Sequence, residues 1–360
     1  MKLSRESKIY VAGHRGLVGS AIWKNLTQRG YTNLVGRSHK ELDLLDAPAV
    51  RRFFDQEQPD AVVLAAAFVG GIMANSRYRA DFIYRNLQIQ QNVIGESFRH
   101  GVKKLLFLGS TCIYPRNAEQ PIKEEALLSS ELEYTNEPYA IAKIAGLKMC
   151  ESFSLQYGCN YIAVMPTNLY GPNDNFHLEN SHVLPAMIRK VHLAKCLNEN
   201  DWDAVRQDLD RRPVEGINGS NSTDEEILLK LAKYGISPEA VTLWGTGTPL
   251  REFLWSEDMA DASVHILLNV DFSDTVPAGC RDVRNCHINI GTGKELTIGE
   301  LATKVIAAVN FRGSLRWDAR YPDGTPRKLT DVSKLHSLGW HHTVEIDDGI
   351  RHLYRWYIEN

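Results

Sequence analysis

The 360-residue chain lacks any long uninterrupted hydrophobic run. Its most apolar early stretch, residues 9–18, is broken by Gly13, His14, Arg15 and Gly16, which is not typical of a signal-peptide core. Nothing approaches the roughly 18 consecutive apolar residues of a membrane-spanning helix. We therefore expect no membrane partner and a cytoplasmic location.

Cysteine is scarce and scattered. None of the six forms a CxxC pair or has histidines at zinc-site spacing; they are Cys112, Cys150, Cys159, Cys196, Cys280 and Cys286. A disulfide framework and a bound metal are both disfavoured, and a reducing compartment fits this usage.

An excess of either charge is also missing. Lysine and arginine number 41, aspartate and glutamate 44, for a net charge of -3. Such a balance gives no electrostatic reason to expect nucleic acid as a partner.

Short apolar runs that alternate with helical patterns fill the first half of the chain. Strands are expected at residues 8–12, 33–36, 61–67, 104–109 and 160–165, and helices at 17–29, 47–56, 80–100 and 138–157. This alternation predicts an α/β fold, a Rossmann-type doubly wound parallel sheet with helices on both faces.

The length suggests about two domains, at roughly 150 residues each. We expect a Rossmann domain over 1–172, with returning segments near 252–272 and 284–294. A smaller C-terminal α/β substrate domain would comprise 173–251 and 295–360. It contains a polar excursion at 198–240, with short helices expected at 201–209 and 224–233. The excursion is interpreted as a surface decoration, with a lid or subunit contact as the alternative.

A GxxGxxG motif follows the first expected strand and opens the first helix. Gly13 suits a tight turn, Gly16 allows close approach of a pyrophosphate, and Gly19 allows the helix to pack on the strand. The helix N-terminus would face the anion. The motif predicts dinucleotide binding.

The second strand indicates which dinucleotide. NAD-binding proteins usually carry an acidic residue near its end, for the ribose 2′-hydroxyl. Here the strand ends in Gly-Arg-Ser-His, without an acid. Arg37, His39 and Arg15 would suit a 2′-phosphate, which favours NADP(H). Asp43 and Leu44 lie where the chain would flank the adenine, and the small Ala65–Ala67 would let a cofactor lie close.

A YxxxK motif predicts a reductive centre. Tyr139 and Lys143 are spaced i, i+4, which places phenol and ammonium on one helix face. The tyrosine can act as a general acid toward a carbonyl while hydride arrives. Ser110, at the end of the fourth strand, would help hold the carbonyl oxygen.

Cys112 lies two residues after Ser110. A cysteine is more often a small buried apolar residue, but this position makes it a candidate base for a proton alpha to a ketone. His182 is the matching candidate acid, because inversion at carbon needs two different protein groups.

Basic residues near Gly/Pro-rich loops are candidates for a diphosphate or a sugar. They are Arg189 and Lys190, which follow His182, together with Arg251 and Lys328.

Taken together, eight segments closely resemble the GDP-L-fucose synthase family. They are VAGHRGLVGSAI, LAAAFVGGI, LGSTCIYP, NEPYAIAKIAG, MPTNLYGPNDNF, ENSHVLPA, WGTGTPLREFL and PDGTPRK, and they run from residue 11 to 328. That family converts GDP-4-keto-6-deoxy-D-mannose to GDP-L-fucose by epimerising C3 and C5 and reducing C4 with NADPH. The resemblance implies a homodimer, for which residues 80–100 and 138–157 are the candidate interface helices.

The resemblance also implies residue roles. Ser110, Tyr139 and Lys143 would be the reductive triad, and Cys112 and His182 the epimerisation pair. It places Gly13, His14, Arg15, Gly16, Leu17, Val18, Gly19, Leu108, Gly109, Ser110, Thr111, Pro166, Thr167, Asn168 and Leu169 against NADP(H), and Lys190, Trp244, Arg251 and Asp323 at substrate-contacting positions. With the candidates already taken from the residues, the expected cofactor-binding set also includes Arg37, His39, Asp43, Leu44, Ala65, Ala67, Lys143 and His182, and the expected substrate-binding set also includes Arg189 and Lys328. Some family members carry Arg where this chain has Lys190.

Other functions remain open at this point. A 4,6-dehydratase resembles this fold but places an Asp-Glu pair where Thr111 and Cys112 stand, and a 4-epimerase leaves Cys112 and His182 unexplained. An epimerase/reductase for a related GDP sugar, such as a 6-deoxy-heptose, fits the same residues. A non-enzymatic NADP(H) sensor would tend to lose Tyr139 or Lys143.

Overall fold

The computed structural model describes residues 2–276, 279, 282–321 and 323–360, so Cys280 lies outside the described residues. The chain divides into two compact units. Unit 1 comprises Met1–Asn173, Glu252–Lys294 and Lys328–Val344, and unit 2 comprises Asp174–Arg251, Glu295–Arg327 and Glu345–Asn360. This division differs from the expected one because residues 328–344 return to unit 1.

Unit 1 is built on a six-stranded sheet, ordered β10-β5-β4-β3-β1-β2, in which each pair of neighbouring strands is parallel. The strands are β1 (Ile9–Ala12), β2 (Leu34–Val35), β3 (Ala61–Leu64), β4 (Lys104–Leu108), β5 (Tyr161–Pro166) and β10 (Ile288–Ile290). The sheet confirms the predicted fold class. Strand β3 is shorter than expected: Ala65 N still donates to Ala12 O (3.0 Å), and the chain then leaves the ladder.

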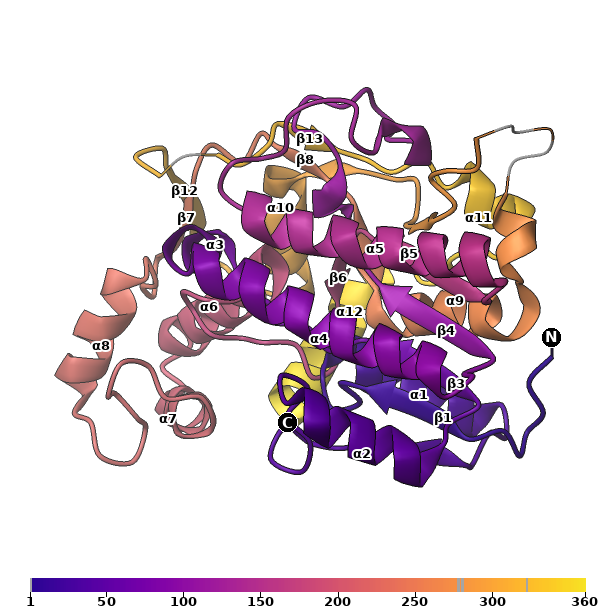
Figure 1. The fold of residues 1–360 in the computed structure, drawn as a ribbon. Coiled ribbons are helices and arrows are strands. Elements are labelled where there is room, and N and C mark those ends of the chain that lie inside the picture. Colours follow the sequence, from indigo (N-terminus) through magenta and orange to yellow (C-terminus); the bar gives the residue numbers. More distant parts are fainter. Residues whose placement is uncertain (1, 277–278, 280–281, 322) are drawn as a thin grey trace. The chain divides into compact units, whose positions relative to one another are not determined.

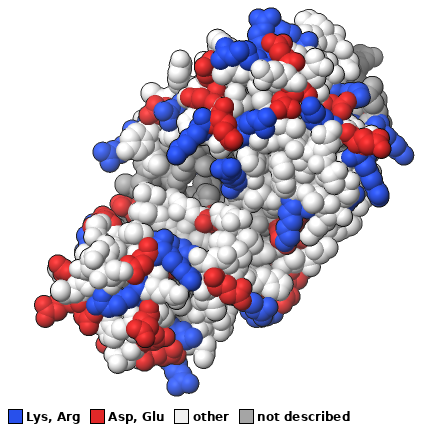
Figure 2. Space-filling model, turned by 90° about the horizontal axis from the view of Figure 1, so that it is seen from below, with Lys and Arg blue, Asp and Glu red and all other residues white. Residues whose placement is uncertain are grey.

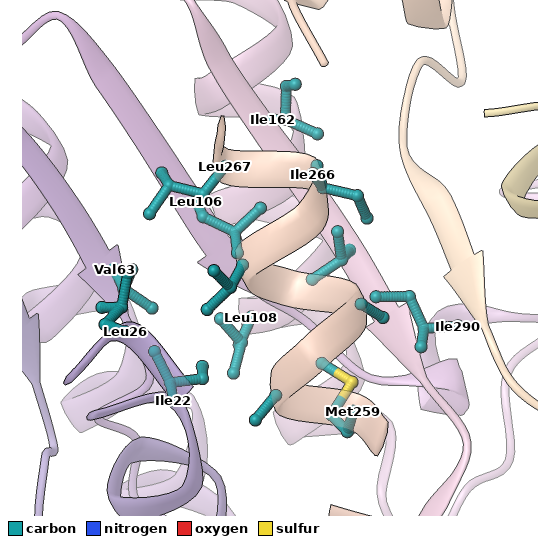
Figure 3. Packing of buried hydrophobic residues seen from close by; sticks show 14 of the residues in the cluster. Ile22, Leu26, Val63, Leu106, Leu108, Ile162, Met259, Ile266, Leu267 and Ile290 are labelled. Carbon is teal, nitrogen blue, oxygen red and sulfur yellow. The ribbon is translucent and has the colours of Figure 1, made fainter. Parts of the chain in front are cut away.

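Helices cover both faces of this sheet (Figure 1). One core cluster joins α1 (Leu17–Gln28) and α9 (Ser256–Asn269) to one face, and a second joins α2 (Ala47–Glu57), α4 (Arg79–Arg99) and α5 (Glu137–Tyr157) to the other. Neighbouring strand residues alternate between the clusters, as a pleated strand requires. Figure 3 shows Leu267 of α9 beside Leu106 of β4, with Met259 at the other end of α9 on the side of Ile290 of β10. Each such side chain contributes about 1.5–3 kcal/mol by burial.

The order of the strands contains a topological switch point. From β1 the chain crosses outward to β2, and from β2 it crosses back to β3 on the other side of β1. The crevice outside the carboxyl ends of β1 and β3 is where open α/β sheets bind their ligands. The motif at residues 13–19 follows β1 directly, and Ala65–Ala67 follow β3.

Smaller elements complete unit 1. Strand β6 (Asn168–Tyr170) pairs in parallel with β9 (Phe253–Trp255). The remaining elements are α3 (Ile72–Arg77), α11 (Ser333–Ser337) and the 3-10 turns η1 (Thr111–Ile113), η2 (Glu124–Ala126) and η3 (Phe272–Thr275).

Unit 2 is also α/β. Strand β7 (Ala240–Trp244) pairs in parallel with β12 (Ser314–Asp318), and β8 (Leu250–Arg251) pairs antiparallel with β11 (Leu296–Thr297). Its helices are α6 (Val183–Asn198), α7 (Trp202–Arg211), α8 (Asp224–Lys233), α10 (Ile298–Val309) and α12 (Ile346–Glu359). Helices α7 and α8 form the excursion. The chain passes from unit 2 to unit 1 within β13 (Arg327–Lys328).

Among the described residues, no helix has the length and apolarity that a membrane span needs. On the face drawn in Figure 2, basic and acidic side chains are intermixed rather than gathered by sign.

Candidate active site

The turn between β1 and α1 has no room for a side chain at two of its glycines. Gly13 has φ +85°, and a Cβ there would lie 2.8 Å from Ala66 N; at Gly19 it would lie 2.1 Å from Gly13 O. Gly16 differs, because its added Cβ would meet Gly13 O at an ordinary 3.5 Å. Packing therefore requires glycine at residues 13 and 19, whereas at Gly16 the space in front of the helix is open.

The N-terminus of α1 is equipped for an anion. Its N-cap is Gly16, no side chain caps it, and its first turn, which begins with Leu17 and Val18, holds no acidic residue. The first backbone N–H groups of a helix have no partner within it and carry partial positive charge. These residues fit the pyrophosphate of a dinucleotide.

Basic residues lie around the end of β2. Arg37 forms an ion pair with Glu57 (2.5 Å), with its guanidinium over the Phe53 ring. The His39 side chain is 80% exposed and lies 3.7 Å from Asp43. Arg15 is exposed.

Glu41, which sequence reasoning did not single out, also faces this region. Its carboxylate accepts hydrogen bonds from Ser38 N (2.7 Å) and Ser38 Oγ (2.6 Å). These bonds lower the pKa of Glu41, with smaller contributions from Arg15 and Arg37. Its charge is thus held by Ser38, and Arg15 stays available for a phosphate.

Two asparagines fix the loops on either side of the cofactor crevice. Asn86, buried on α4, accepts from Phe68 N (2.9 Å) and donates to Phe68 O (2.9 Å), which holds the chain after Ala65–Ala67. Asn92 donates to Leu44 O (2.8 Å).

His14 packs against Gly36, where an added Cβ would lie 2.6 Å from the imidazole. The tight packing of these loops had no visible signal in the sequence.

Tyr139 and Lys143 lie on one face of α5, as their spacing predicts. Lys143 is buried, donates to Leu108 O (2.8 Å) and has its Nζ 5.8 Å from the Tyr139 ring centroid. Burial lowers the pKa of Lys143 to about 8. Burial also raises the pKa of Tyr139, and Cys112 adds to that rise. The phenol is therefore protonated at neutral pH, as a proton donor must be.

Ser110 and Cys112 are positioned by η1. Ser110 Oγ caps this turn by accepting from Cys112 N (3.2 Å). The Cys112 sulfur faces two donors, Asn136 Nδ2 at 3.3 Å and Lys328 Nζ at 3.9 Å. Asn136 is the N-cap of α5, so the thiol lies at the start of the helix that carries Tyr139. An amide N–H and an ammonium are both hydrogen-bond donors, and the sulfur of a cysteine is an acceptor.

A buried polar network fixes Tyr114, the residue that follows η1. Tyr114 donates to Asn289 Oδ1 (2.5 Å) and lies 2.9 Å from His287 Nε2, and Asn289 N donates to Glu124 (2.9 Å). Burial lowers the pKa of His287 to about 3, so its ring is neutral. The partners are far apart in sequence, and sequence reasoning missed them.

The segment Pro166–Leu169 is fixed through Glu252. Asn168 Nδ2 donates to Glu252 O (2.8 Å). The Glu252 carboxylate is fully buried and accepts from Thr292 N and Gly293 N (both 2.7 Å) and from Thr330 Oγ1 (2.7 Å). Glu252 thus ties together three segments of unit 1.

In unit 2, His182 is the exposed N-cap of α6. The loop before it is organised by His177, whose Nδ1 accepts from Glu179 N and Asn180 N (both 3.2 Å). Ser181 Oγ donates to His177 O (2.6 Å).

Lys190 and Trp244, two residues predicted to bind substrate, lie close to each other in unit 2. Lys190 is buried, and its Nζ lies 5.6 Å from the Trp244 ring centroid. Burial lowers the pKa of Lys190 to about 8. Asp323 accepts from Thr246 N (3.0 Å) and Thr246 Oγ1 (2.6 Å), just beyond Trp244. Arg251 is half-buried and donates to Leu250 O (2.8 Å).

Arg189 does not join this group. Its side chain is 1% exposed, forms an ion pair with Asp208 (2.9 Å), and donates to Phe176 O (3.3 Å) and Arg212 O. Successive residues of a helix point about 100° apart, so Arg189 and Lys190 leave α6 in different directions. The expected substrate contact for Arg189 is replaced by an internal structural role.

Comparison with known proteins gives the class. The NAD dependent epimerase/dehydratase family matches residues 9–210 and 214–291. The chain belongs to this family.

Particular relatives are similar over nearly the whole chain. GDP-L-fucose synthase 1 of Arabidopsis thaliana is 51% identical over 99% of this chain and 94% of that protein. GDP-L-fucose synthase of Escherichia coli (strain K12) is 47% identical over 99% of this chain and 98% of that protein. A solved GDP-D-glycero-L-gluco-heptose synthase from Campylobacter jejuni, determined in the presence of NADPH, is 45% identical with a TM-score of 0.90 over 99% of each chain.

Proposed function

We propose that the protein converts GDP-4-keto-6-deoxy-D-mannose to GDP-L-fucose by 3,5-epimerisation and NADPH-dependent reduction of the C4 ketone. One observation supports epimerisation in addition to the reduction that the family's Tyr and Lys perform. The Cys112 thiol meets Asn136 at the N-terminus of the helix that presents Tyr139 and Lys143. A reductase alone needs no such thiol. Two relatives named GDP-L-fucose synthase, 51% and 47% identical, support the substrate.

Epimerisation begins at Cys112. Its thiolate takes the proton from the carbon next to the C4 ketone, and the electron pair of that C–H bond moves into an enolate. His182 returns a proton to the carbon, and the carbonyl re-forms with inverted configuration. The exchange occurs once at C3 and once at C5, and between the two inversions Cys112 releases its proton to solvent and His182 takes one up from solvent. Asn136 and Lys328 donate to the Cys112 sulfur and hold it in place.

Reduction follows at C4. NADPH, when bound, supplies the hydride. Tyr139 donates its phenolic proton to the C4 oxygen, and Ser110 helps hold that oxygen. Lys143, fixed by Leu108 O at 2.8 Å, stabilises the phenolate that Tyr139 becomes. General acid catalysis of this kind typically contributes about 10²–10⁴-fold.

The proposal also assigns residues to the binding of the cofactor and of the substrate. Arg15, Arg37 and His39 favour the 2′-phosphate of NADP(H), and the α1 N-terminus holds the pyrophosphate. Lys190, Arg251, Trp244 and Asp323 bind the GDP sugar. Arg189 is left out because its side chain is fully buried and paired with Asp208, whereas Arg37 remains partly exposed beside Glu57.

The experiment is turnover of GDP-4-keto-6-deoxy-D-mannose with NADPH, with product stereochemistry read by NMR. The expected product is GDP-L-fucose, with solvent deuterium at C3 and C5. Tyr139→Phe should bind NADPH as before but lose reduction. A wild-type protein that binds NADPH and turns over no ketosugar would instead act as a cofactor sensor.

A second candidate substrate is a GDP-4-keto-heptose. It is favoured by the 45% identity and TM-score of 0.90 to the Campylobacter jejuni heptose synthase. Parallel kcat/KM measurements on both ketosugars decide between them. A higher value for the heptose would overturn the fucose assignment and leave the reaction type intact.

The proposal includes a homodimer in the cytoplasm. The outer surface of α4 and α5 exposes Tyr84 (68%), Phe98 (38%) and Ile141 (41%), an apolar face suited to a second copy. The free cysteines among the described residues suit a reducing compartment.

A further inference from the structure

Two aromatic rings are stacked at the ends of the paired strands β7 and β12. Trp244, the last residue of β7, lies against Tyr321, with ring centroids 4.4 Å apart and planes inclined by 13°. Both side chains are 43% exposed. Large aromatic rings that stack on each other while remaining open to solvent form a ready surface for another flat group.

Backbone and side-chain hydrogen bonds hold Tyr321 in place. Tyr321 N donates to Asp318 O (3.3 Å), and Gly245 N donates to the same carbonyl (3.0 Å). Two residues beyond Tyr321, Asp323 binds Thr246, the second residue after Trp244 (3.0 and 2.6 Å). The turn after β12 is thus tied to the end of β7 on both sides of the stack, which preorganises it.

Two basic residues of unit 2 lie near the stacked pair or near Asp323, which follows it. Lys190 Nζ lies 5.6 Å from the Trp244 ring centroid, and Arg251 interacts electrostatically with Asp323. A flat aromatic plate beside two cations matches a ligand with a planar base at one end and a diphosphate next to it. Base–aromatic stacking contributes about 1–3 kcal/mol per base.

From this arrangement we infer that Tyr321 is a base-recognition residue. Stacked on Trp244, it presents an outer aromatic face on which the purine of a nucleoside diphosphate stacks, and it thereby favours GDP over a pyrimidine diphosphate. The two fused rings of a purine cover more of that face than the single ring of a pyrimidine does. This inference rests on the proposed function, because that function supplies a GDP sugar as the ligand.

Titration calorimetry of GDP and UDP with the full-length protein tests the inference. Tyr321→Ala should weaken GDP binding about tenfold, within the range of base stacking, and should weaken UDP less. Tyr321→Phe keeps the ring and should bind within about twofold of wild type, on the same grounds. Leu229→Ala, which truncates a 77% exposed side chain on α8 of the same unit, should not change GDP binding.

Steady-state kinetics provides the second measurement. Tyr321→Ala should raise KM for the GDP sugar and leave kcat unchanged, with NADPH affinity as in wild type. Equal GDP affinity of Tyr321→Ala and wild type would overturn the inference while leaving the proposed function intact. Failure of the wild type to bind GDP at all would instead overturn the proposed function.

Discussion

The Cys112 sulfur contacts donors from two distant parts of the chain, Asn136 at 3.3 Å and Lys328 at 3.9 Å. A buried apolar cysteine would have no need of an amide and an ammonium. The contacts therefore agree with the base function proposed for this residue.

Cys112→Ala should stop solvent deuterium uptake at C3 and C5 of the ketosugar. The reason is that alanine cannot remove a carbon-bound proton, and a loss of about 10²-fold or more is expected for removal of a general base. NMR of the ketosugar in D₂O measures the rate of this uptake. Cys196→Ala, a change at a thiol buried in unit 2, is the matched control and should exchange as wild type does. Undiminished exchange in Cys112→Ala would assign the base elsewhere.

The buried Lys143 sets a pH limit on reduction. Its pKa is lowered to about 8, so the ammonium is present below that pH and is lost as the pH rises through it. The reductive kcat should therefore fall about tenfold per unit well above that pKa. Lys143→Arg keeps a cation at every pH tested. Its reductive kcat should be lower than that of the wild type but should not change with pH over the same range. An identical alkaline fall in both enzymes would show that another group is responsible.

At the scale of elements, the β1–α1 turn depends on glycine for two separable reasons. At Gly19 an added Cβ meets Gly13 O at 2.1 Å, and a backbone atom cannot give way; at Gly16 the nearest contact is 3.5 Å. Packing requires glycine at residue 19, whereas Gly16 leaves room for a ligand.

Gly19→Ala should lower the free energy of unfolding by about 1–3 kcal/mol, as overpacking does. Gly16→Ala should leave stability nearly unchanged and still weaken NADPH binding, because its methyl group enters the pyrophosphate space. Chemical denaturation and NADPH fluorescence titration measure the two effects. Equal NADPH affinity of Gly16→Ala and wild type would argue that the pyrophosphate does not bind here.

For the whole molecule, the proposed dimer face offers a sharp test at Gly95. This glycine lies on α4, where an added Cβ would meet nothing within 4 Å. Gly95→Ala should be tolerated by the monomer, since alanine favours a helix by about 0.5–1 kcal/mol. Gly95→Arg should block a second copy and shift sedimentation from twice the 40.6 kDa chain mass to that of one chain. Leu229→Arg on α8 is the control. If Gly95→Arg stayed a dimer, α4 would not be the interface.

The sequence predicted elements better than contacts. The strands and helices of the Rossmann sheet lie within a few residues of their predicted positions because hydrophobic periodicity is local information. Strand β3 ends at Leu64, three residues before its predicted end, and the chain leaves the ladder after the bond from Ala65 N to Ala12 O. The return of residues 328–344 to unit 1 was also not predicted, since the bond from Ile122 N to Leu329 O (2.7 Å) joins segments about two hundred residues apart.

The glycine turn, the YxxxK spacing and the position of Cys112 after a strand were all predicted from the sequence. These features rest on backbone geometry over a few residues, which a motif encodes directly. Only the tertiary structure separated Lys190 from the internally paired Arg189, because that choice depends on which helix face is covered. It also brought Asn136 and Lys328 to the thiol and laid Tyr321 on Trp244. Such contacts arise from segments that meet only when the chain is folded, and no local pattern records them.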